Sequence, residues 1–327
     1  MNASKKPRIA AAGIAYALVV LLGNGLLPVI NNARPSDLEE ILFTLMTVVV
    51  ELAAITPFVF LEQRHDGKPL REFLSSKGSW RRYWIWFVTI GAIFAVATYL
   101  LVVGLSISDP STGSVAMKTM PISSVIIGYF FLGERLTWRH VACIVAMLAA
   151  VVFVATKGTF LLGELSVGAV LLLVPPALWS VGHAMSKKLL TSGVVSATQM
   201  IAIRTSMSGA MLFVMYIVAT GGSSAWQILD GSYLIFMILM GINYAAMHYC
   251  WYKALQRIDM SLATGIGIPS PIVTALLAAT LLGSPVQWYH LIGMAASFAG
   301  MFGLLWQKKQ PKATGANFVD AMAPETA

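Results

Sequence analysis

Four charged or titratable side chains stand inside segments of the chain that are otherwise apolar. Lys118 interrupts the run 114–138, and Glu51 lies in the middle of another run. Arg204 and His248 stand within two more. A charge at the centre of a bilayer costs about 2.5–3.5 kcal/mol on insertion scales, so such residues usually mark binding sites, proton relays or ion pairs. These four side chains are therefore the first candidates for chemistry.

Composition shows why those segments must be membrane spans. The 327 residues are 57% hydrophobic and only 11% charged, with a mean hydropathy of +0.76. Soluble domains carry about 25% charged residues, so this chain has too few charges to cover a water-exposed surface. The formal net charge of +8 does not indicate a nucleic-acid partner, because the basic residues stand in short loops between apolar runs. The chain is predicted to be a polytopic membrane protein.

Apolar windows predict ten spans, and the basic residues predict their orientation. Of the 22 lysines and arginines, 18 fall on the side that holds both termini, only Arg34 and Lys157 fall on the other, and Lys118 and Arg204 lie within spans. This asymmetry predicts that both termini are cytoplasmic, in a multi-pass protein of a bacterial inner membrane. The predicted spans are 9–30, 40–61, 83–106, 112–132, 138–156, 165–186, 194–219, 233–252, 260–282 and 287–306.

A single offset of 150 residues aligns two parts of the chain without a gap over about 65 residues. It places Gly91 on Gly241 and Pro121 on Pro271. Because five spans is an odd number, the second copy of a duplicated five-span unit enters the membrane from the opposite side. Secondary transporters use such inverted repeats to expose a midplane site alternately to each side. Further matched pairs are Tyr99–Tyr249, Asp109–Asp259, Trp138–Trp288 and His140–His290.

The predicted domain organisation follows from this repeat. Residues 1–8 form a cytoplasmic N-terminus, 9–156 the first five-helix repeat and 165–306 the second. Residues 307–327 have no apolar helical face and are predicted to be a disordered cytoplasmic tail. The expected fold is all-α, with ten transmembrane helices in two inverted-topology repeats.

Four stretches resemble the EamA-type permeases of the drug/metabolite transporter superfamily. PISSVIIGYFFLGERLTW (121–138) is similar to their fourth span and loop, and PPALWSVGHAMSKKLL (175–190) to their sixth span. QMIAIRTSMSGAMLF (199–213) is similar to the next span with its arginine, and 268–305 to the closing helix pair, where Ser284 and Pro285 replace the Glu-Arg of the first half. The resemblance covers about residues 9–306.

The resemblance implies a small-metabolite exporter or exchanger. Its cavity would lie between spans 3, 4, 8 and 9, with contributions from spans 1 and 6. Arg204 stands outside these cavity helices, which favours a structural role for it. Lys118 departs from the commonest EamA pattern and is more similar to the nucleotide-sugar and triose-phosphate branch, where lysines hold phosphate.

Lys118 and Glu51 each have several candidate roles. Lys118 could bind the carboxylate or phosphate of a substrate, pair with Glu51, or snorkel to the outer interface about two turns away. Glu51 could neutralise Lys118 or Arg204, take up a coupling proton, or bind a cationic substrate. On its helix Lys118 shares a face with Ser114, whose equivalent in the second repeat is Thr264.

Further polar and aromatic residues complete the predicted pocket. Tyr244 and His248 share one face of span 8, where His248 is either a proton relay or a hydrogen-bonded packing residue. Prolines remove backbone donors in membrane helices, which is tolerated where a helix lines a cavity, although a simple kink is the alternative. The other pocket candidates are Tyr99, Asn24, Trp179 and His183, and the predicted helix breaks are at Pro121, Pro269, Pro271, Pro175 and Pro176.

These residues predict a secondary transporter for a small anionic or zwitterionic metabolite, such as an amino acid, organic acid or phosphorylated compound. The alternatives are efflux of cationic compounds through Glu51 and, more remotely, an intramembrane enzyme that uses Glu51 and His248 as acid and base. No HExxH, GxSxG or Walker-type sequence occurs, so no enzyme activity, cofactor or metal is expected. The expected partners are the substrate, the lipid bilayer and a proton or counter-substrate, with a homodimer as a further alternative.

Overall fold

The computed structural model describes residues 5–66, 79–120, 122–123, 126, 138–161, 166–191, 195–255, 257, 263 and 266–305. Pro121, Thr264, the greater part of the basic loop and the predicted tail 307–327 lie outside the described residues. The protein is an all-α membrane protein, and the described residues contain no strand. Among the described residues, six helical segments are long and apolar enough to cross a membrane, and two shorter apolar helices, Val141–Ala155 and Ser270–Leu281, accompany them.

The helices of the first repeat are α1 (Lys5–Ala33), α2 (Glu40–Asp66), α4 (Ser79–Ser106), α5 (Pro110–Ala116) with the short 3-10 turn η1 (Met117–Thr119), and α7 (Trp138–Ala155). Those of the second are α8 (Val167–Leu171) with α9 (Val174–Thr191), α10 (Ala197–Thr220), α11 (Gly231–Leu255), α13 (Ser270–Leu281) and α14 (Trp288–Leu305). A 3-10 turn, η3 (Ala225–Ile228), joins α10 to α11.

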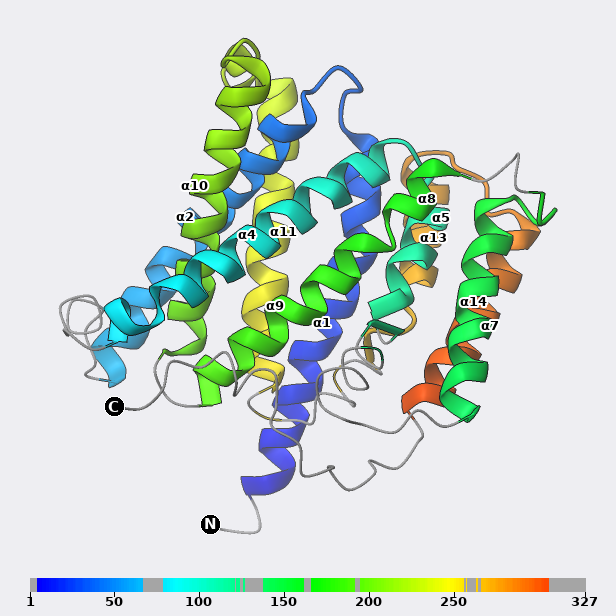
Figure 1. Cartoon of the computed structure of the whole chain (residues 1–327), viewed down its shortest axis with the longest axis horizontal. Coiled ribbons are helices and arrows are strands. Elements are labelled where there is room, and N and C mark those ends of the chain that lie inside the picture. The colour runs from blue at the N-terminus through cyan, green and yellow to red at the C-terminus, as the bar shows by residue number, and fades with distance from the viewer. Residues whose placement is uncertain are drawn as a thin grey trace.

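The packing of the helices follows the sequence repeat. The offset of 150 relates α4 to α11 and α7 to α14, and it matches the span that contains α5 with the span that contains α13. By order in the chain, α1 corresponds to α8 and α9, and α2 to α10. Contacts across the two halves occur in matched pairs: α1 packs on α11 as α9 packs on α4, and α2 packs on α11 as α10 packs on α4. Three contacting helix pairs, α2–α10, α5–α13 and α7–α14, join helices of equivalent spans in the two repeats. In Figure 1 duplicated helices such as α7 and α14 run in opposite directions, as inverted repeats require.

Two glycines that the repeat matches occupy equivalent crossing points. A Cβ on Gly91 would lie 2.3 Å from the Cβ of Met207 on α10. A Cβ on Gly241 would lie 2.5 Å from the Cβ of Val50 and 2.8 Å from the carbonyl oxygen of Thr47 on α2. Both glycines therefore allow a helix of one repeat to approach a helix of the other at backbone distance.

The pair α7–α14 is packed through small residues in the same way. A Cβ on Gly293 would lie 2.0 Å from Val154, and one on Gly300 would lie 2.5 Å from Met147. These two glycines therefore let α14 approach α7 closely, which joins the two repeats within one chain.

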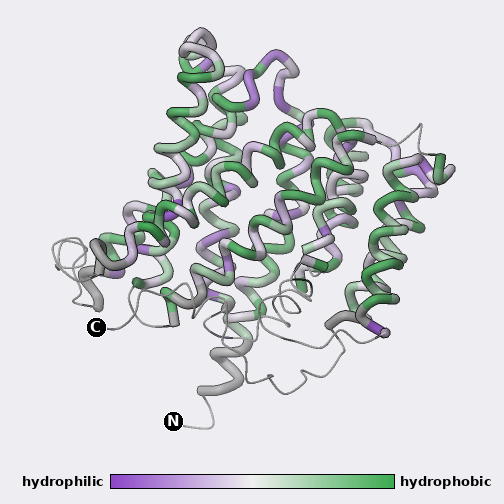
Figure 2. The backbone as a smooth tube through the Cα atoms, viewed as in Figure 1, coloured by the Kyte–Doolittle hydropathy of each residue, from purple (hydrophilic) through white to green (hydrophobic). Residues whose placement is uncertain are grey.

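Apolar side chains cover the outside of the bundle. Figure 2 shows hydrophobic residues along most of the length of the helices, whereas the connection between α1 and α2 is hydrophilic. Large apolar side chains that face outward include Leu22 at 54%, Leu291 at 60% and Val218 at 81% exposure. This surface suits contact with lipid tails rather than water.

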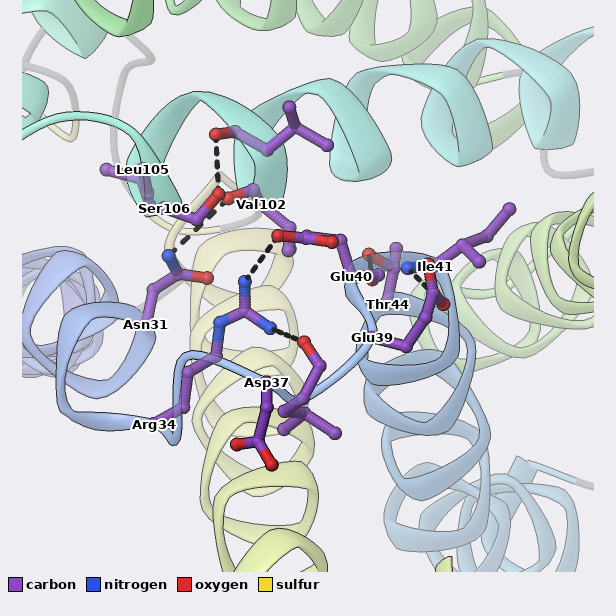
Figure 3. Close-up of polar contacts among 12 residues, drawn as sticks. Asn31, Arg34, Asp37, Glu39, Glu40, Ile41, Thr44, Val102, Leu105 and Ser106 are labelled. Carbon is purple, nitrogen blue, oxygen red and sulfur yellow. Dashed lines mark hydrogen bonds and ion pairs between the residues drawn. The ribbon is translucent and has the colours of Figure 1, made fainter. Parts of the chain in front are cut away.

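A polar network closes the bundle at the end where α1 meets α2. Arg34 donates to the carbonyl of Leu38 at 2.9 Å and lies 3.5 Å from the Oε1 of Glu40 (Figure 3). Asn31 reaches the carbonyl of Val102 on α4 at 3.5 Å, and Tyr233 of α11 donates to Asp37 at 2.5 Å. These contacts tie α1, α2, α4 and α11 together at the face that the distribution of basic residues predicts to be the outer one.

Candidate functional site

A cavity of about 150 Å³ lies at the centre of the bundle, between the two repeats. Its wall includes residues from α1, α4, η1, α9, α11 and α14, together with residues 263 and 267–268 that precede α13. Both repeats therefore contribute to one site. Among the described residues, its polar and aromatic lining comprises Asn24, Phe94, Lys118, Trp179, His183, Tyr244, His248 and Trp251.

Most of the predicted pocket residues meet in this cavity. Six of the nine, namely Lys118, Asn24, Trp179, His183, Tyr244 and His248, line it, and so does Pro176. Tyr99 and Ser114 are not among its lining residues; Ser114 is buried, at 3% exposure, with its hydroxyl turned to no described partner. Thr264 lies outside the described residues.

Lys118 stands where the helix of span 4 is interrupted. The Asp109 carboxylate caps α5 by accepting the N–H of Thr112 at 2.9 Å, and Pro110 occupies the first turn. This helix ends at Ala116, and Lys118 has a ψ of 17°, outside the helical range. The interruption places the lysine on the cavity wall rather than within a continuous helix.

Prolines mark two further interruptions. Span 6 is divided into α8 and α9, with Pro175 and Pro176 in the first turn of α9, where their missing N–H groups need no partner within the helix. In span 9, Pro269 is the N-cap of α13 and Pro271 follows in its first turn. These prolines therefore begin helices beside the cavity instead of kinking them. Pro121 lies outside the described residues.

Glu51, Arg204 and His248 form a buried polar cluster next to the cavity. Arg204 Nη2 donates to Glu51 Oε1 at 2.7 Å, and His248 Nδ1 lies 2.7 Å from the same oxygen. The distance between Arg204 Nη2 and His248 Nδ1 is 2.9 Å. The Glu51 and Arg204 side chains are only 4% and 2% exposed. The carboxylate and guanidinium therefore neutralise one another away from water, and His248 alone of the three also lines the cavity.

Capping residues define both ends of α10, the helix that carries Arg204. Ser196 and Gln199 form a capping box at the start of α10, and Gly221 closes its end in the left-handed region with a φ of 61°. The Arg204 guanidinium lies 4.4 Å from the ring centroid of Phe94, which supports it from α4 by a cation–π contact.

Because Glu51 pairs with Arg204, its carboxylate is not a partner of Lys118. Of the alternatives that the sequence raised, a Lys118–Glu51 ion pair does not form, because the Glu51 carboxylate is bound to α10 and α11. No ion pair of Lys118 occurs within the described part of the chain. Its side chain lines the cavity and is the one lysine or arginine among the described residues of that lining.

Aromatic rings make up much of the remaining wall. His183 packs edge-on against Phe94 at 5.2 Å between ring centroids and lies 6.3 Å from Trp251. Tyr244 packs against His248 at 5.4 Å. The sequence analysis did not identify Trp251 or Met247, although both continue the helical face of Tyr244 and His248 at three-residue spacing.

The comparisons with known proteins agree with this architecture. A sequence model of the EamA-like transporter family matches residues 11–156 and 166–306. The uncharacterized transporter YetK of Bacillus subtilis (strain 168) is 22% identical over 221 residues, which are 65% of this chain and 65% of YetK, just under two thirds of its length. A solved protein crystal structure is 19% identical with a TM-score of 0.61, covering 91% of this chain and 97% of its own. At that identity the likeness supports the fold alone.

Proposed function

Because the chain belongs to the EamA-like transporter family, and so is a membrane transporter, we propose that it carries a small anionic or zwitterionic metabolite. An amino acid, an organic acid or a phosphorylated compound would fit this description. The Lys118 ammonium binds the carboxylate or phosphate of the substrate inside the central cavity.

The observation that carries this proposal is the charge balance of the site. Lys118 lines the cavity, whereas the carboxylate of Glu51 is bonded to Arg204 and His248 behind its wall. A charge in a site of low polarity needs a partner of opposite sign, or its burial is costly. An anion from solution supplies that partner when it binds.

The size and lining of the cavity narrow the substrate further. A cavity of about 150 Å³ is comparable to one that holds benzene, so the bound molecule is small. Trp179, Trp251 and Tyr244 present aromatic rings to this space. A ring face attracts an ammonium group, so an amino acid would place its carboxylate at Lys118 and its ammonium near these rings.

Transport would follow from the inverted repeats. α1, α4 and η1 from the first repeat, together with α9 and α11 from the second, contribute to the same cavity. Rocking of one repeat against the other exposes such a midplane site to each side in turn, as an exporter or exchanger requires. Both termini would be cytoplasmic in a bacterial inner membrane, as the distribution of basic residues predicts.

A coupling proton would reside on the cluster of Glu51, Arg204 and His248. Arg204 only donates hydrogen bonds, so a protonated His248 Nδ1 donates to Glu51 while a bare Nδ1 accepts from Arg204. The cluster thus has a satisfied arrangement in either protonation state. Exchange for a counter-substrate is the alternative source of energy.

Cation efflux through Glu51 has less support. Glu51 is 3% exposed and does not line the central cavity. A cationic substrate would have to displace Arg204 from the carboxylate and would meet Lys118 in the same space. An intramembrane enzyme using Glu51 and His248 gains no support from the family match, which points to a transporter.

A ligand panel on purified protein tests the substrate class. Anionic, zwitterionic and cationic metabolites are added to wild type and to Lys118→Ala, and thermal unfolding is recorded. A ligand at 100 times its Kd stabilises the protein by about 2.7 kcal/mol. We expect a small acid or phosphate to raise the Tm of wild type but not of Lys118→Ala.

Lys157→Asn is the matched control. It removes a basic side chain outside the cavity, at a φ of 53° that asparagine tolerates. Stabilisation of wild type by cations alone, with Lys118→Ala responding equally, would reject the anion proposal in favour of a cationic substrate.

A further inference from the structure

A second, much smaller cavity lies behind the wall of the first. Its volume is about 10 Å³, and it is enclosed by α2, α4, α9, α10 and α11. Phe94, Trp179, Tyr244 and His248 line both cavities, so the wall between the two includes these four side chains. Glu51 and Arg204 line the small cavity but not the large one.

Four polar atoms at this small cavity lack a hydrogen-bond partner among the residues that the structure describes. They are Thr47 Oγ1, Arg204 Nη1, Thr205 Oγ1 and Tyr244 OH. Their side chains come from three helices, and the four residues are between 0% and 3% exposed. Native proteins rarely leave even one buried polar group unsatisfied without water or another ligand. Four around one space therefore indicate a shared ligand.

We propose that one water molecule binds in this small cavity and bridges α2, α10 and α11. A space of about 10–15 Å³ on this measure is enough for a single water. The water accepts from Arg204, which can only donate, and from the hydroxyl of Tyr244, and it donates to Thr47 and Thr205. All four of its hydrogen bonds are then formed and all four atoms are satisfied.

Other occupants fit the site less well. A metal ion would lie against the Arg204 guanidinium, which carries the same sign of charge. The described residues contain no cluster of three or more histidine, cysteine, aspartate or glutamate side chains that would hold a metal. An apolar group would leave the four polar atoms unsatisfied. Water is neutral and matches the donors and acceptors.

The water connects the buried ion pair with the wall of the larger cavity. Arg204 has Nη2 on Glu51 and Nη1 free for the water, and Tyr244 has its ring against His248 on the cavity wall. The bound water orients the Tyr244 hydroxyl and thereby holds this part of the wall. The inference does not depend on which substrate the larger cavity binds.

A map of the whole wild-type protein that resolves ordered water tests the site directly. We expect a peak within about 2.6–3.2 Å of Arg204 Nη1 and of at least two of the three hydroxyl oxygens. Direct hydrogen bonds among these side chains with no peak between them would overturn the proposal. A peak that bromide replaces in an anomalous map would identify an anion and would overturn it as well.

A double-mutant cycle tests the same site in solution. Thr47→Val and Thr205→Val each remove one hydroxyl with little change of shape, and their hydroxyls share no direct hydrogen bond. If they share one water, the loss of Tm in the double variant is smaller than the sum of the single losses. Additive losses would contradict a shared water. Thr56→Val, whose hydroxyl bonds to Leu52 of its own helix, is the control and should be additive with either.

Discussion

The guanidinium of Arg204 lies 2.7 Å from the carboxylate of Glu51, and both side chains are almost completely buried. This contact joins α10 to α2, one duplicate of the repeat to the other. It also means that the Glu51 carboxylate is bound to a residue other than Lys118. With Glu51 paired to Arg204, Lys118 remains as a cation that lines the central cavity.

Removing one partner of the Glu51–Arg204 pair should lower the free energy of unfolding far more than removing both. Arg204→Met leaves the Glu51 charge buried with only His248 beside it, which costs about 3–5 kcal/mol in unfolding free energy. The double variant Glu51→Gln/Arg204→Met leaves no buried charge and should be more stable than Arg204→Met alone. Thermal unfolding in detergent measures both. A double variant that loses the sum of the single losses would show that the charges act independently.

Replacing Gly91 or Gly241, the glycines at the two helix crossings, by alanine should weaken the contact between the repeats. Gly91→Ala and Gly241→Ala each place a methyl group within 2.5 Å of a neighbouring side chain, and overpacking of this kind costs about 1–3 kcal/mol. Gly231→Ala is the control, because a Cβ there meets nothing within 4 Å. We expect Gly91→Ala and Gly241→Ala to have a lower Tm than wild type. Gly231→Ala should not show this decrease. Equal behaviour of all three would mean that the helices do not approach at these points.

Asp109 should make the protein sensitive to acid. Burial opposes ionisation of its carboxyl group, but hydrogen bonds from His290 and Thr112 outweigh this effect and lower its pKa. A carboxylate with a lowered pKa stabilises the folded state above the unfolded value, about 3.9, and loses that contribution as the pH falls through the folded pKa. The stability is therefore present above about pH 4 and declines below it.

Asp109→Asn isolates this contribution. Asparagine caps a helix about as well as aspartate, so the start of α5 is preserved while the charge is removed. The Tm of the variant should fall less than that of wild type between about pH 5 and pH 3. Curves that remain parallel over this range would show that the carboxylate does not supply the effect.

The aromatic wall should set the upper limit on substrate size. Trp251→Ala removes a large side chain from the lining of the central cavity and enlarges it. We expect the variant to be stabilised by acids larger than those that stabilise wild type, as measured by thermal unfolding with acids of increasing length. Trp226→Ala, a change at a tryptophan that is 56% exposed and distant from this lining, should keep the size limit of wild type. An unchanged limit in Trp251→Ala would place the substrate elsewhere.

The fold could be predicted because the apolar runs that mark its helices are long and recur in a second copy along the sequence. Long apolar runs fix the helices, and one offset of 150 fixes their pairing, so Gly91 and Gly241 could be matched before their neighbours Met207 and Val50 were known. The sequence predicts a break in span 4 at Pro121, which lies outside the described residues, so that prediction stays untested; within the described part of this span, Lys118 has non-helical φ and ψ angles. A proline disturbs the turn that precedes it, and Lys118 stands three residues earlier.

The site could be predicted only in part. Lys118, Tyr244 and His248 are identifiable because polar residues are rare in membrane helices, whereas Trp251 resembles any lipid-facing or packed aromatic residue in the sequence. The choice of Arg204 as the partner of Glu51 depends on the rotation of α2 and α10 about their axes. That rotation is set by packing between helices, which no local pattern records.

Counterflow in proteoliposomes tests the central claim most directly. The acid or phosphate that stabilises wild type is loaded inside, and uptake of the labelled compound is compared among wild type, Lys118→Gln and Lys157→Asn. The account predicts counterflow by wild type and Lys157→Asn and its loss in Lys118→Gln, while all three unfold at similar temperatures without ligand. Counterflow of the anion by Lys118→Gln at the wild-type rate and half-saturating concentration would contradict it.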